Sequence, residues 1–350
     1  MQYVNLGRSG LKVSRLSFGK GVIFLDDDEE AQKLANTLIK LAWDRGINYF
    51  DTAELYSFGK GERQTGIALK NLGVPRSDYV VSTKIFWGNF ADNTNTVNNI
   101  GTSRKRIIEG LDRSLKNLQL DYVDIVFFHR YDIETPTIEV VQAMKDVIAS
   151  GKALYWAAST WPAHRVMEAM LLCDIVGCPR PIAEQCQYNM LVRDEVEKDY
   201  IDLFDDYGLG TTIRSPLCSG ILAGKYNNGV PEGSRFDLAK NWKPILHDQH
   251  LGTEELRKAT VAKLNALAEI AKKIGCTQVQ LSIAWTLKND DVSTAIMGAS
   301  SEKQLKENLD SFAFVDKLTP EILKEIEDVL DNRPSLGMDY RTFQPRPFRR

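Results

Sequence analysis

The chain lacks the features that mark membrane and exported proteins. None of its apolar runs approaches the roughly 20 residues that a membrane-spanning helix needs. Its first residues, Met-Gln-Tyr-Val-Asn-Leu-Gly, lack the basic and then apolar segment of a secretory signal. We therefore expect no direct insertion into a membrane and no export through a signal peptide.

Cysteine is sparse, and the net charge is small. The five cysteines are an odd number without the close spacing of a metal site. They indicate reduced thiols and a cytoplasmic location. The net charge of −3 gives no general attraction for nucleic acid or for an anionic membrane surface. We therefore expect no nucleic-acid partner.

The sequence also lacks a linker or a composition break that would divide it. Its 350 residues are 43% hydrophobic and 26% charged, which is ordinary globular composition. Single α/β barrels reach this length, so we predict one domain over residues 1–340. Residues 341–350 combine two prolines with several arginines and are predicted to form a flexible tail.

What is present is a repeated alternation of short apolar runs and helical patterns. An alternating segment at 2–14 with a glycine turn predicts a hairpin ahead of the main fold. Eight apolar runs then predict buried parallel strands, at 16–19, 47–50, 79–84, 122–128, 152–159, 182–187, 209–215 and 294–297. Helical patterns separate them, including one at 192–207, and a further helix is predicted at 318–330. Residues 26–28 offer an acidic cap for the first of these helices.

This alternation predicts a closed (β/α)₈ TIM barrel with an N-terminal β-hairpin and extra C-terminal helices. The runner-up is an open doubly wound sheet. That fold would require a Gly-x-Gly-x-x-Gly turn after an early strand, and the chain has none. The long connection 216–253 is a candidate lid because simple turns are much shorter.

Three successive predicted strands end in reactive side chains. Asp51, Lys84 and His129 stand at these ends, and Tyr56 lies just beyond the first. The carboxyl ends of barrel strands share one face, so these four groups can converge there. A buried Lys84 would need Asp51 as partner, and a phenol beside an ammonium is a stronger acid than its usual pKa of about 10 indicates.

Such a set suits protonation of a carbonyl oxygen, with the imidazole orienting that oxygen. The side chains supply no hydride, so a reduction would need a cofactor. The competing interpretation is structural. Asp51 would then cap its strand and pair with Lys84, Tyr56 would be a surface residue, and His129 would be a core histidine.

The chain resembles the aldo-keto reductases, and within them the β subunits of voltage-gated potassium channels. The resemblance runs through Asn-Leu-Gly-Arg-Ser-Gly-Leu-Lys-Val-Ser at 5–14, Phe-Asp-Thr-Ala-Glu-Leu-Tyr at 50–56 and Thr-Lys-Ile-Phe-Trp-Gly at 83–88. It continues through 104–124, Ser-Pro-Leu-Cys-Ser-Gly-Ile-Leu-Ala-Gly-Lys-Tyr at 215–226 and Gly-Ala-Ser-Ser-Glu-Lys-Gln-Leu-Lys-Glu-Asn at 298–308. Long motifs spread over residues 1–341 make it specific.

The resemblance implies reduction of aldehydes and ketones with NADPH, Asp51, Tyr56, Lys84 and His129 as the catalytic set, and Tyr56 as general acid. It implies that Ser159 and Gln185 hold the nicotinamide carboxamide. The remaining cofactor positions that it implies are Arg214 beneath the nicotinamide, Ser215, Leu217, Ser219, Gly220 and Lys225 along the pyrophosphate, Arg235 near the 2′-phosphate, and Ser300, Gln304, Glu307 and Asn308 at the adenosine.

Some of these positions also have a physical argument. Residues 298–300 precede a helix, whose backbone N–H groups and dipole favour anions. Lys225 and Arg235 bring positive charge from the long connection. Trp87 and Trp161 suggest an aromatic wall for a substrate, although aromatic residues at strand ends also serve packing.

Two positions depart from the channel β subunits. His129 stands where they have asparagine, which favours a working enzyme. Arg214 stands where they have tryptophan beneath the nicotinamide. A planar guanidinium can stack there, but Arg214 could equally turn away and pair with a carboxylate of the long connection.

No metal site is predicted. His247 and His250 have a usable spacing but lack cysteine or acidic partners in register, so a solvated loop is expected. Cys218 is interpreted as a small loop residue, with redox sensitivity as the alternative.

Two functions remain open at this point. The first is an NADPH-dependent reductase of small carbonyl compounds. The second is a cytoplasmic regulatory β subunit of a potassium channel that binds NADPH and turns over slowly. The resemblance also implies a homotetramer, since the channel β subunits form fourfold rings.

Overall fold

A closed barrel of parallel strands forms the centre of the protein. The computed structural model describes residues 1–19, 29–88, 97–238 and 245–337. Strand order around the barrel is β10-β3-β4-β5-β6-β7-β8-β9, and every neighbouring pair is parallel. The strands are β3 Leu16–Gly19, β4 Tyr49–Asp51, β5 Val80–Ile85, β6 Val123–Phe128, β7 Ala153–Ala158, β8 Ala183–Glu184, β9 Gly210–Ile213 and β10 Thr294–Met297.

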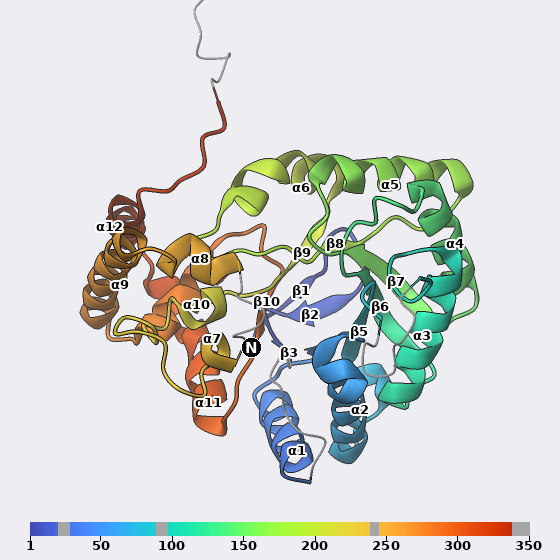
Figure 1. Cartoon of the computed structure of the whole chain (residues 1–350), viewed down its shortest axis with the longest axis horizontal. Coiled ribbons are helices and arrows are strands. Elements are labelled where there is room, and N and C mark those ends of the chain that lie inside the picture. Colours follow the sequence, from blue (N-terminus) through green and yellow to red (C-terminus); the bar gives the residue numbers. More distant parts are fainter. Residues whose placement is uncertain (20–28, 89–96, 239–244, 338–350) are drawn as a thin grey trace, which may run out of the picture.

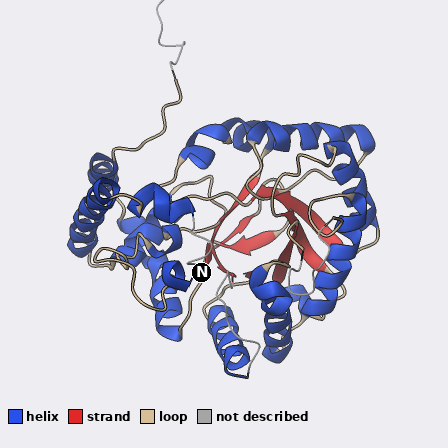
Figure 2. Cartoon of the chain, viewed as in Figure 1, coloured by secondary structure: helices blue, strands red, loops and turns tan. Residues whose placement is uncertain are grey.

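Helices surround this barrel (Figures 1 and 2). They are α1 Glu29–Asp44, α2 Lys60–Leu72, α3 Arg104–Leu118, α4 Thr137–Ala149, α5 Ala163–Val176, α6 Ile201–Tyr207, α7 Arg235–Leu238, α8 Ile245–Leu251, α9 Glu254–Ile274, α10 Gln278–Lys288, α11 Glu302–Asp310 and α12 Pro320–Leu330. The architecture is the predicted (β/α)₈ barrel with extra C-terminal helices, of which α12 packs against α9.

Successive side chains along the barrel strands belong alternately to two hydrophobic clusters, one on each side of the barrel wall. Phe50, Val81, Val126 and Phe128 join the large cluster between strands and helices. Tyr49, Val80, Ile125 and Phe127, one position earlier in each case, join a smaller cluster inside the barrel. Successive side chains of a strand point to opposite faces, so this register decides which side chains face the interior.

The predicted N-terminal hairpin is present and closes one end of the barrel. Strands β1 Tyr3–Asn5 and β2 Lys12–Ser14 pair antiparallel, and Leu6 packs with the inner cluster. Gly7 has a φ of 58°, and a Cβ on it would lie 2.5 Å from the backbone nitrogen of Gly210. Only glycine fits this close approach, which fixes the hairpin against the start of β9.

Several element bounds differ from the sequence prediction. The predicted strand 182–187 is reduced to Ala183–Glu184, after which Gln187 forms only an isolated bridge to Arg214. The predicted helix 192–207 is a π-helix, η4 Glu195–Asp199, followed by α6. A 3₁₀ helix, η6 Ser311–Lys317, was not predicted. The spacing of apolar residues does not distinguish α-, π- and 3₁₀-helices, so it could not predict the bounds of η4 and η6.

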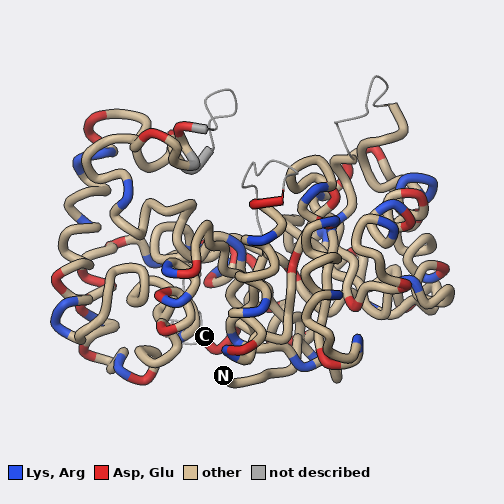
Figure 3. Tube along the Cα trace, turned by 90° about the horizontal axis from the view of Figure 1, so that it is seen from below, with Lys and Arg blue, Asp and Glu red and all other residues tan. Residues whose placement is uncertain are grey.

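The long connection is only partly described. It contains a 3₁₀ turn, η5 Cys218–Gly220, and the short helices α7 and α8, while residues 239–244 lie outside the described residues. The predicted cap at 26–28 and the predicted tail at 341–350 also lie outside them. Within the described part of the chain, no helix has the length and apolar character needed to cross a membrane. Figure 3 shows acidic and basic residues interspersed along the chain.

Candidate active site

The barrel register brings the predicted reactive groups to one place. Asp51 is the last residue of β4 and shares the inward face with Tyr49. Lys84, near the end of β5, has the same parity as Val80, and His129 directly follows β6 with the parity of Phe127. All three side chains therefore face the barrel interior at the carboxyl ends of neighbouring strands.

Lys84 and Asp51 form an ion pair inside the barrel. The Lys84 side chain is 0% exposed, and its ammonium also donates to the carbonyl oxygen of Thr52 at 2.8 Å. Burial disfavours the charged ammonium, but the Asp51 carboxylate and the Tyr56 phenol outweigh it, so the pKa of Lys84 is raised. The ammonium therefore remains charged although its side chain is fully buried.

Asp51 is held by further donors. The Ser82 hydroxyl donates to Asp51 Oδ1 at 2.7 Å, and Tyr49 contacts the same hydroxyl oxygen at 2.9 Å. The Gln185 amide donates to Asp51 Oδ1 at 3.2 Å. These contacts leave the carboxylate little freedom and fix the position of Lys84 in turn.

Tyr56 stands over this pair. Its ring centre lies 4.9 Å from Lys84 Nζ and 5.9 Å from the His129 ring, at an interplanar angle of 82°. Tyr56 begins the short helix η1 Tyr56–Gly59, in which Ser57 and Phe58 have left-handed φ values of 50° and 56°. Such backbone costs about 1–3 kcal/mol per residue and is typical of functional sites. The tight turn keeps Tyr56 half-buried at the barrel mouth.

His129 is a neutral imidazole in this site. Burial, with the positive charges of Lys84, Arg130 and Arg214, holds the pKa of His129 well below its usual range. Its Nδ1 atom is buried and has no hydrogen-bond partner among the described residues. Buried ring nitrogens are usually paired, so this nitrogen is available to a bound group.

The four groups can together act on a carbonyl. Tyr56 can give a proton, the neighbouring ammonium stabilises the phenolate that remains, and a neutral imidazole offers one N–H donor. Tyr56 and His129 lie in edge contact, so one small acceptor atom could reach both. The arrangement therefore suits transfer of a proton to a carbonyl oxygen.

Ser159 and Gln185 lie together next to this set. Ser159 donates to the backbone oxygen of Gln185 at 3.1 Å, and both side chains are buried. The Gln185 amide nitrogen is engaged by Asp51 and by Thr212 Oγ1, at 3.3 Å for the latter. The two predicted carboxamide contacts are thus adjacent to the predicted catalytic groups.

The segment after β9 contains several residues with left-handed backbone. Ser215, Cys218 and Ser219 have φ values of 55°, 48° and 56°, and Gly220 has 98°. Successive residues with such φ values can turn backbone N–H groups toward one anion. Asn189, which is fully buried, donates to the Ser215 carbonyl oxygen at 3.0 Å and steadies the loop. Leu217 is half-buried within it, and Lys225 is exposed just beyond.

A helix N-terminus faces the other end of this region. β10 ends at Met297, and α11 begins at Glu302, with Ser301 as its N-cap. Gln304 accepts from the backbone and the hydroxyl of Ser300, both at 2.9 Å. Asn308 donates to the Gly298 carbonyl oxygen at 3.2 Å, and Glu307 is half-buried in the next turn. The backbone N–H groups and the dipole at a helix N-terminus favour a phosphate group, even where a side chain caps one of the N–H groups as Ser301 does here.

The structure describes the contacts of only one of the two arginines predicted to bind the cofactor. Arg214 is half-buried and donates to Gln187 Oε1 at 2.9 Å. It forms no ion pair with a carboxylate in the described part of the chain. Arg235 is the first residue of α7, and its side chain lies outside the described residues.

These residues are consistent with a dinucleotide. They combine a left-handed loop, a helix N-terminus and basic side chains with a buried amide beside the reactive groups. Ser159, Gln185 and Arg214 would hold its nicotinamide end. The loop at 215–220, Lys225 and the start of α11 would hold its phosphates and adenosine.

The two predicted pocket tryptophans have different surroundings. Trp87 is half-buried at the mouth, and the Arg130 guanidinium lies 5.9 Å from its ring centre. Trp161 is only 2% exposed and packs between Phe128, at 6.2 Å, and Tyr131, at 5.2 Å. Trp161 is thus part of the wall behind the site rather than its open surface.

Sequence reasoning missed several residues that shape this site. Glu54 pairs with Arg106, and its Oε1 accepts from the backbone N–H groups of Phe86 and Gly88 on either side of Trp87. Ser82 and Arg130 were also missed. Glu54 lies inside the motif around Tyr56 and Arg130 directly follows His129, so proximity to a predicted catalytic residue was the available signal.

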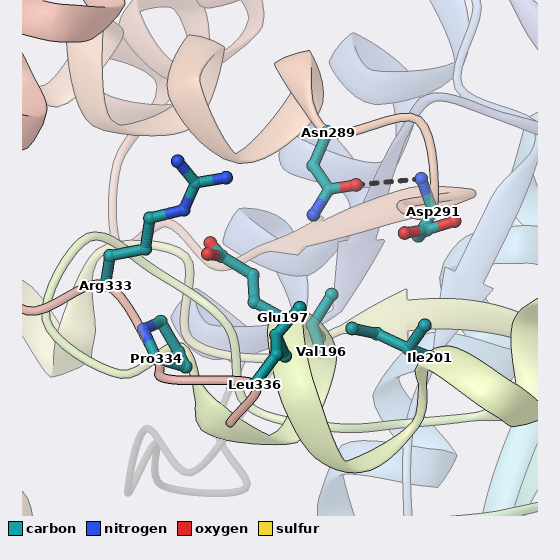
Figure 4. A pocket seen from close by; sticks show the side chains of 8 residues that line it. All are labelled: Val196, Glu197, Ile201, Asn289, Asp291, Arg333, Pro334 and Leu336. Atoms are coloured by element: carbon teal, nitrogen blue, oxygen red, sulfur yellow. Dashed lines mark hydrogen bonds between the residues drawn. The ribbon is translucent and has the colours of Figure 1, made fainter. Parts of the chain in front are cut away.

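A surface hollow elsewhere has none of this chemistry. It has a volume of about 340 Å³ and is lined by residues such as Glu197, Asn289 and Arg333 (Figure 4). These residues belong to η4, the turn before β10 and the segment after α12, and none stands at the carboxyl end of a barrel strand. We therefore place the reactive centre at the barrel mouth.

The described residues contain no group of three or more histidine, cysteine or acidic side chains arranged for a metal ion. His247 contacts Asp248 at 3.1 Å and Phe236 at a ring distance of 5.3 Å.

Burial raises the pKa of Cys218 to about 12, although Arg214 opposes this shift. Its thiol is therefore not activated in this state.

Comparison with known proteins agrees with the geometry. The aldo/keto reductase family matches residues 15–331. The chain is 47% identical over 336 residues to a "Putative voltage-gated potassium channel subunit beta" of Schizosaccharomyces pombe, covering 96% of this chain and 95% of that protein. It is 44% and 43% identical over 342 residues to proteins of Oryza sativa and Arabidopsis thaliana, each named "Probable voltage-gated potassium channel subunit beta". Both matches cover 97% of this chain and 100% of the relative. The chain belongs to the aldo/keto reductase family.

Proposed function

We propose that this protein reduces aldehydes and ketones to alcohols with NADPH, and that Tyr56 is the general acid. The observation that carries the proposal is the fully buried Lys84 ammonium, held between the Asp51 carboxylate and the Tyr56 phenol. Membership of an oxidoreductase family supports the same reaction type.

Each of the four residues has a distinct part in the proposed reaction. Tyr56 gives its proton to the carbonyl oxygen, and Lys84 stabilises the phenolate that remains. Asp51 keeps the ammonium in place and charged. The neutral His129 ring donates a hydrogen bond to the same oxygen and orients the carbonyl.

The nicotinamide, when bound, supplies the hydride that no side chain can provide. Ser159 and Gln185 would hold its carboxamide beside Asp51, and the left-handed loop at 215–220 would bind the pyrophosphate. Ser300, Gln304, Glu307 and Asn308 would contact the adenosine end near the start of α11. Lys225 would add positive charge at the pyrophosphate, and Arg235 would add it at the 2′-phosphate of NADPH.

The test is the consumption of NADPH by the purified protein with a panel of aldehydes and ketones, followed by absorbance. Turnover that depends on both the carbonyl compound and the protein is expected. Absence of turnover with every compound, while NADPH still binds, would reject the reductase proposal.

A second candidate is a regulatory potassium channel β subunit that binds NADPH and turns over slowly. The names of the three relatives, matched over nearly their whole length, favour it. This function would place the protein in the cytoplasm as a homotetramer bound to a channel. A monomer mass in light scattering at micromolar concentration would count against it.

A further inference from the structure

Two arginine side chains flank the reactive groups, and the carboxyl groups of Glu184 and Glu195 attract both of them without forming a close ion pair among the described residues. Arg130 donates to the backbone oxygen of His129 and to Thr160 Oγ1, the latter at 3.4 Å. Arg214 donates to Gln187. Both guanidinium groups are half-buried, and neither forms an ion pair with a carboxylate of the described residues.

The positive charges act on one another. The pKa of Arg130 is lowered by burial and then by Arg214, against the opposing influence of Tyr56, Glu195 and Glu184. Both arginines also contribute to the low pKa of His129. Burial raises the pKa of Glu184 and Glu195, which favours their neutral forms and limits how far they offset the two arginines. An anion placed beside the partly desolvated guanidinium groups would lower the free energy of the site.

Arg130 lies away from the candidate phosphate-binding residues, on the part of the barrel mouth that we call the substrate side. Arg130 follows β6 and lies against Trp87, which follows β5. The phosphate-binding candidates follow β9 and β10, and in the closed ring β6 is three strands from β9 and four from β10. Arg214, which follows β9, belongs to the cofactor side and adds to the positive potential from there.

Arg130 is also held in a defined orientation. Its guanidinium lies between the Trp87 ring and Thr160, a residue with a left-handed φ of 56°. Trp87 is itself fixed, because Glu54 binds the backbone on both sides of it. A guanidinium fixed at one edge still offers its remaining N–H groups, and their fork matches a carboxylate.

We propose that the preferred substrates are oxo acids, whose carboxylate binds Arg130 while their carbonyl oxygen lies between Tyr56 and His129. The proposal rests on the reductase function above and specifies its substrate class. Trp87 forms a flat apolar wall for the carbon chain or ring that joins the two groups. Neutral aldehydes of the same shape bind without this contact.

The test compares an aldehyde that carries a carboxylate with its uncharged methyl ester, whose aldehyde is, if anything, the more electrophilic of the two. These are 4-formylbenzoate and its methyl ester, each assayed with saturating NADPH. A charged hydrogen bond contributes about 1.5–3 kcal/mol, so kcat/KM for the acid should exceed that for the ester by roughly tenfold or more. The ratio should fall toward one in Arg130→Gln and with rising ionic strength.

A matched control is Arg165→Gln. Arg165 also lies over an aromatic ring, 4.9 Å from the centre of Tyr131, but pairs with Glu168 on the surface of α5. This variant should keep the wild-type preference for the acid. An equal preference for acid and ester in the wild type, or an unchanged ratio in Arg130→Gln, would overturn the proposal while leaving the reductase function standing.

Calorimetric titration keeps the two proposals separate. 4-Formylbenzoate and its ester are titrated into the NADPH-loaded Tyr56→Phe variant, in which turnover is not required. Tighter binding of the acid that is lost when Arg130→Gln is added supports the carboxylate site, even if no carbonyl compound is reduced. Equal binding of both probes contradicts it.

Discussion

Glu54 and Arg106 are 52 residues apart in the chain and form an ion pair in which each side chain is only 2% exposed. The pair joins the loop that carries Tyr56 to the start of α3. Arg106 also donates to the backbone oxygen of Asn99 at 2.8 Å, and Glu54 holds the backbone around Trp87. The walls of the active site are therefore joined by one buried pair.

Removing one partner of this pair should be costly. Glu54→Gln or Arg106→Gln leaves a buried charge without its counterpart, which typically costs about 3–5 kcal/mol of unfolding free energy. Urea unfolding measures it. The control is Arg45→Gln, which breaks the exposed pair with Asp310 and should cost less than about 1 kcal/mol. Similar losses of unfolding free energy for the buried and the exposed pair would show that burial does not determine the cost of removing one partner.

Whether a feature of the site could be predicted from the sequence depends on whether it follows from a local pattern or from a contact between distant residues. Asp51, Lys84 and His129 were predicted together because the carboxyl ends of barrel strands share one face. The contact of Glu54 with Arg106 was not predictable, since no local pattern ties a loop carboxylate to a helix 52 residues away. The π-helix η4 was also missed, because an apolar stripe looks similar in both helix types.

Among the residues predicted to bind the cofactor, some features could likewise be predicted from the sequence and others could not. Ser159 and Gln185 were predicted only through the resemblance to the aldo-keto reductases, and the structure brings Gln185 into contact with Asp51 and with Ser159. The left-handed backbone at Ser215, Cys218 and Ser219 could not be foreseen, since none of the three is glycine. Their conformation is imposed by tertiary contacts, including the bond from Asn189.

Cofactor preference should depend on Arg235. A guanidinium can bind the 2′-phosphate of NADPH with two parallel hydrogen bonds, which NADH cannot reciprocate. We expect tighter binding of NADPH than of NADH, with a reduced ratio in Arg235→Ala. Intrinsic fluorescence titration with both cofactors measures this. Equal affinities in the wild type, or the same ratio in Arg235→Ala, would exclude this role.

Arg214 should favour the reduced cofactor. Its bond to Gln187 keeps it at the barrel mouth, where the family places the nicotinamide. The oxidised ring is positive, and two like charges about 4 Å apart cost up to roughly 4 kcal/mol at an effective dielectric constant near 20. The ratio of the Kd of NADP⁺ to that of NADPH should therefore fall in Arg214→Trp.

Arg214→Gln separates charge from ring stacking. It removes the charge without supplying an aromatic face, so it should lower the same ratio if repulsion is the cause. An unchanged ratio in both variants would leave Arg214 without a part in cofactor discrimination.

The burial of a neutral His129 predicts a stability loss in mild acid. Its pKa in the folded protein lies well below the ordinary value of 6.5. As the pH falls below that value, the unfolded chain takes up a proton that the folded protein excludes. Unfolding is then favoured by up to about 1.4 kcal/mol per pH unit.

His129→Asn should remove this contribution. Urea unfolding between pH 5 and 8, flanking the ordinary value, should show a flatter dependence for the variant than for the wild type. His164→Asn, at an exposed position on α5, is the matched control and should follow the wild type. Identical curves for wild type and His129→Asn would mean that His129 is not held neutral by the fold.

The central claim is that Tyr56 gives the proton to the carbonyl oxygen, and Tyr56→Phe tests it most directly. The variant retains the ring beside Lys84 and removes only the hydroxyl, so NADPH should bind with unchanged Kd. General acid catalysis contributes about 10²–10⁴-fold, and kcat should fall by this factor because only the transition state uses the proton. A kcat equal to that of the wild type would contradict the account.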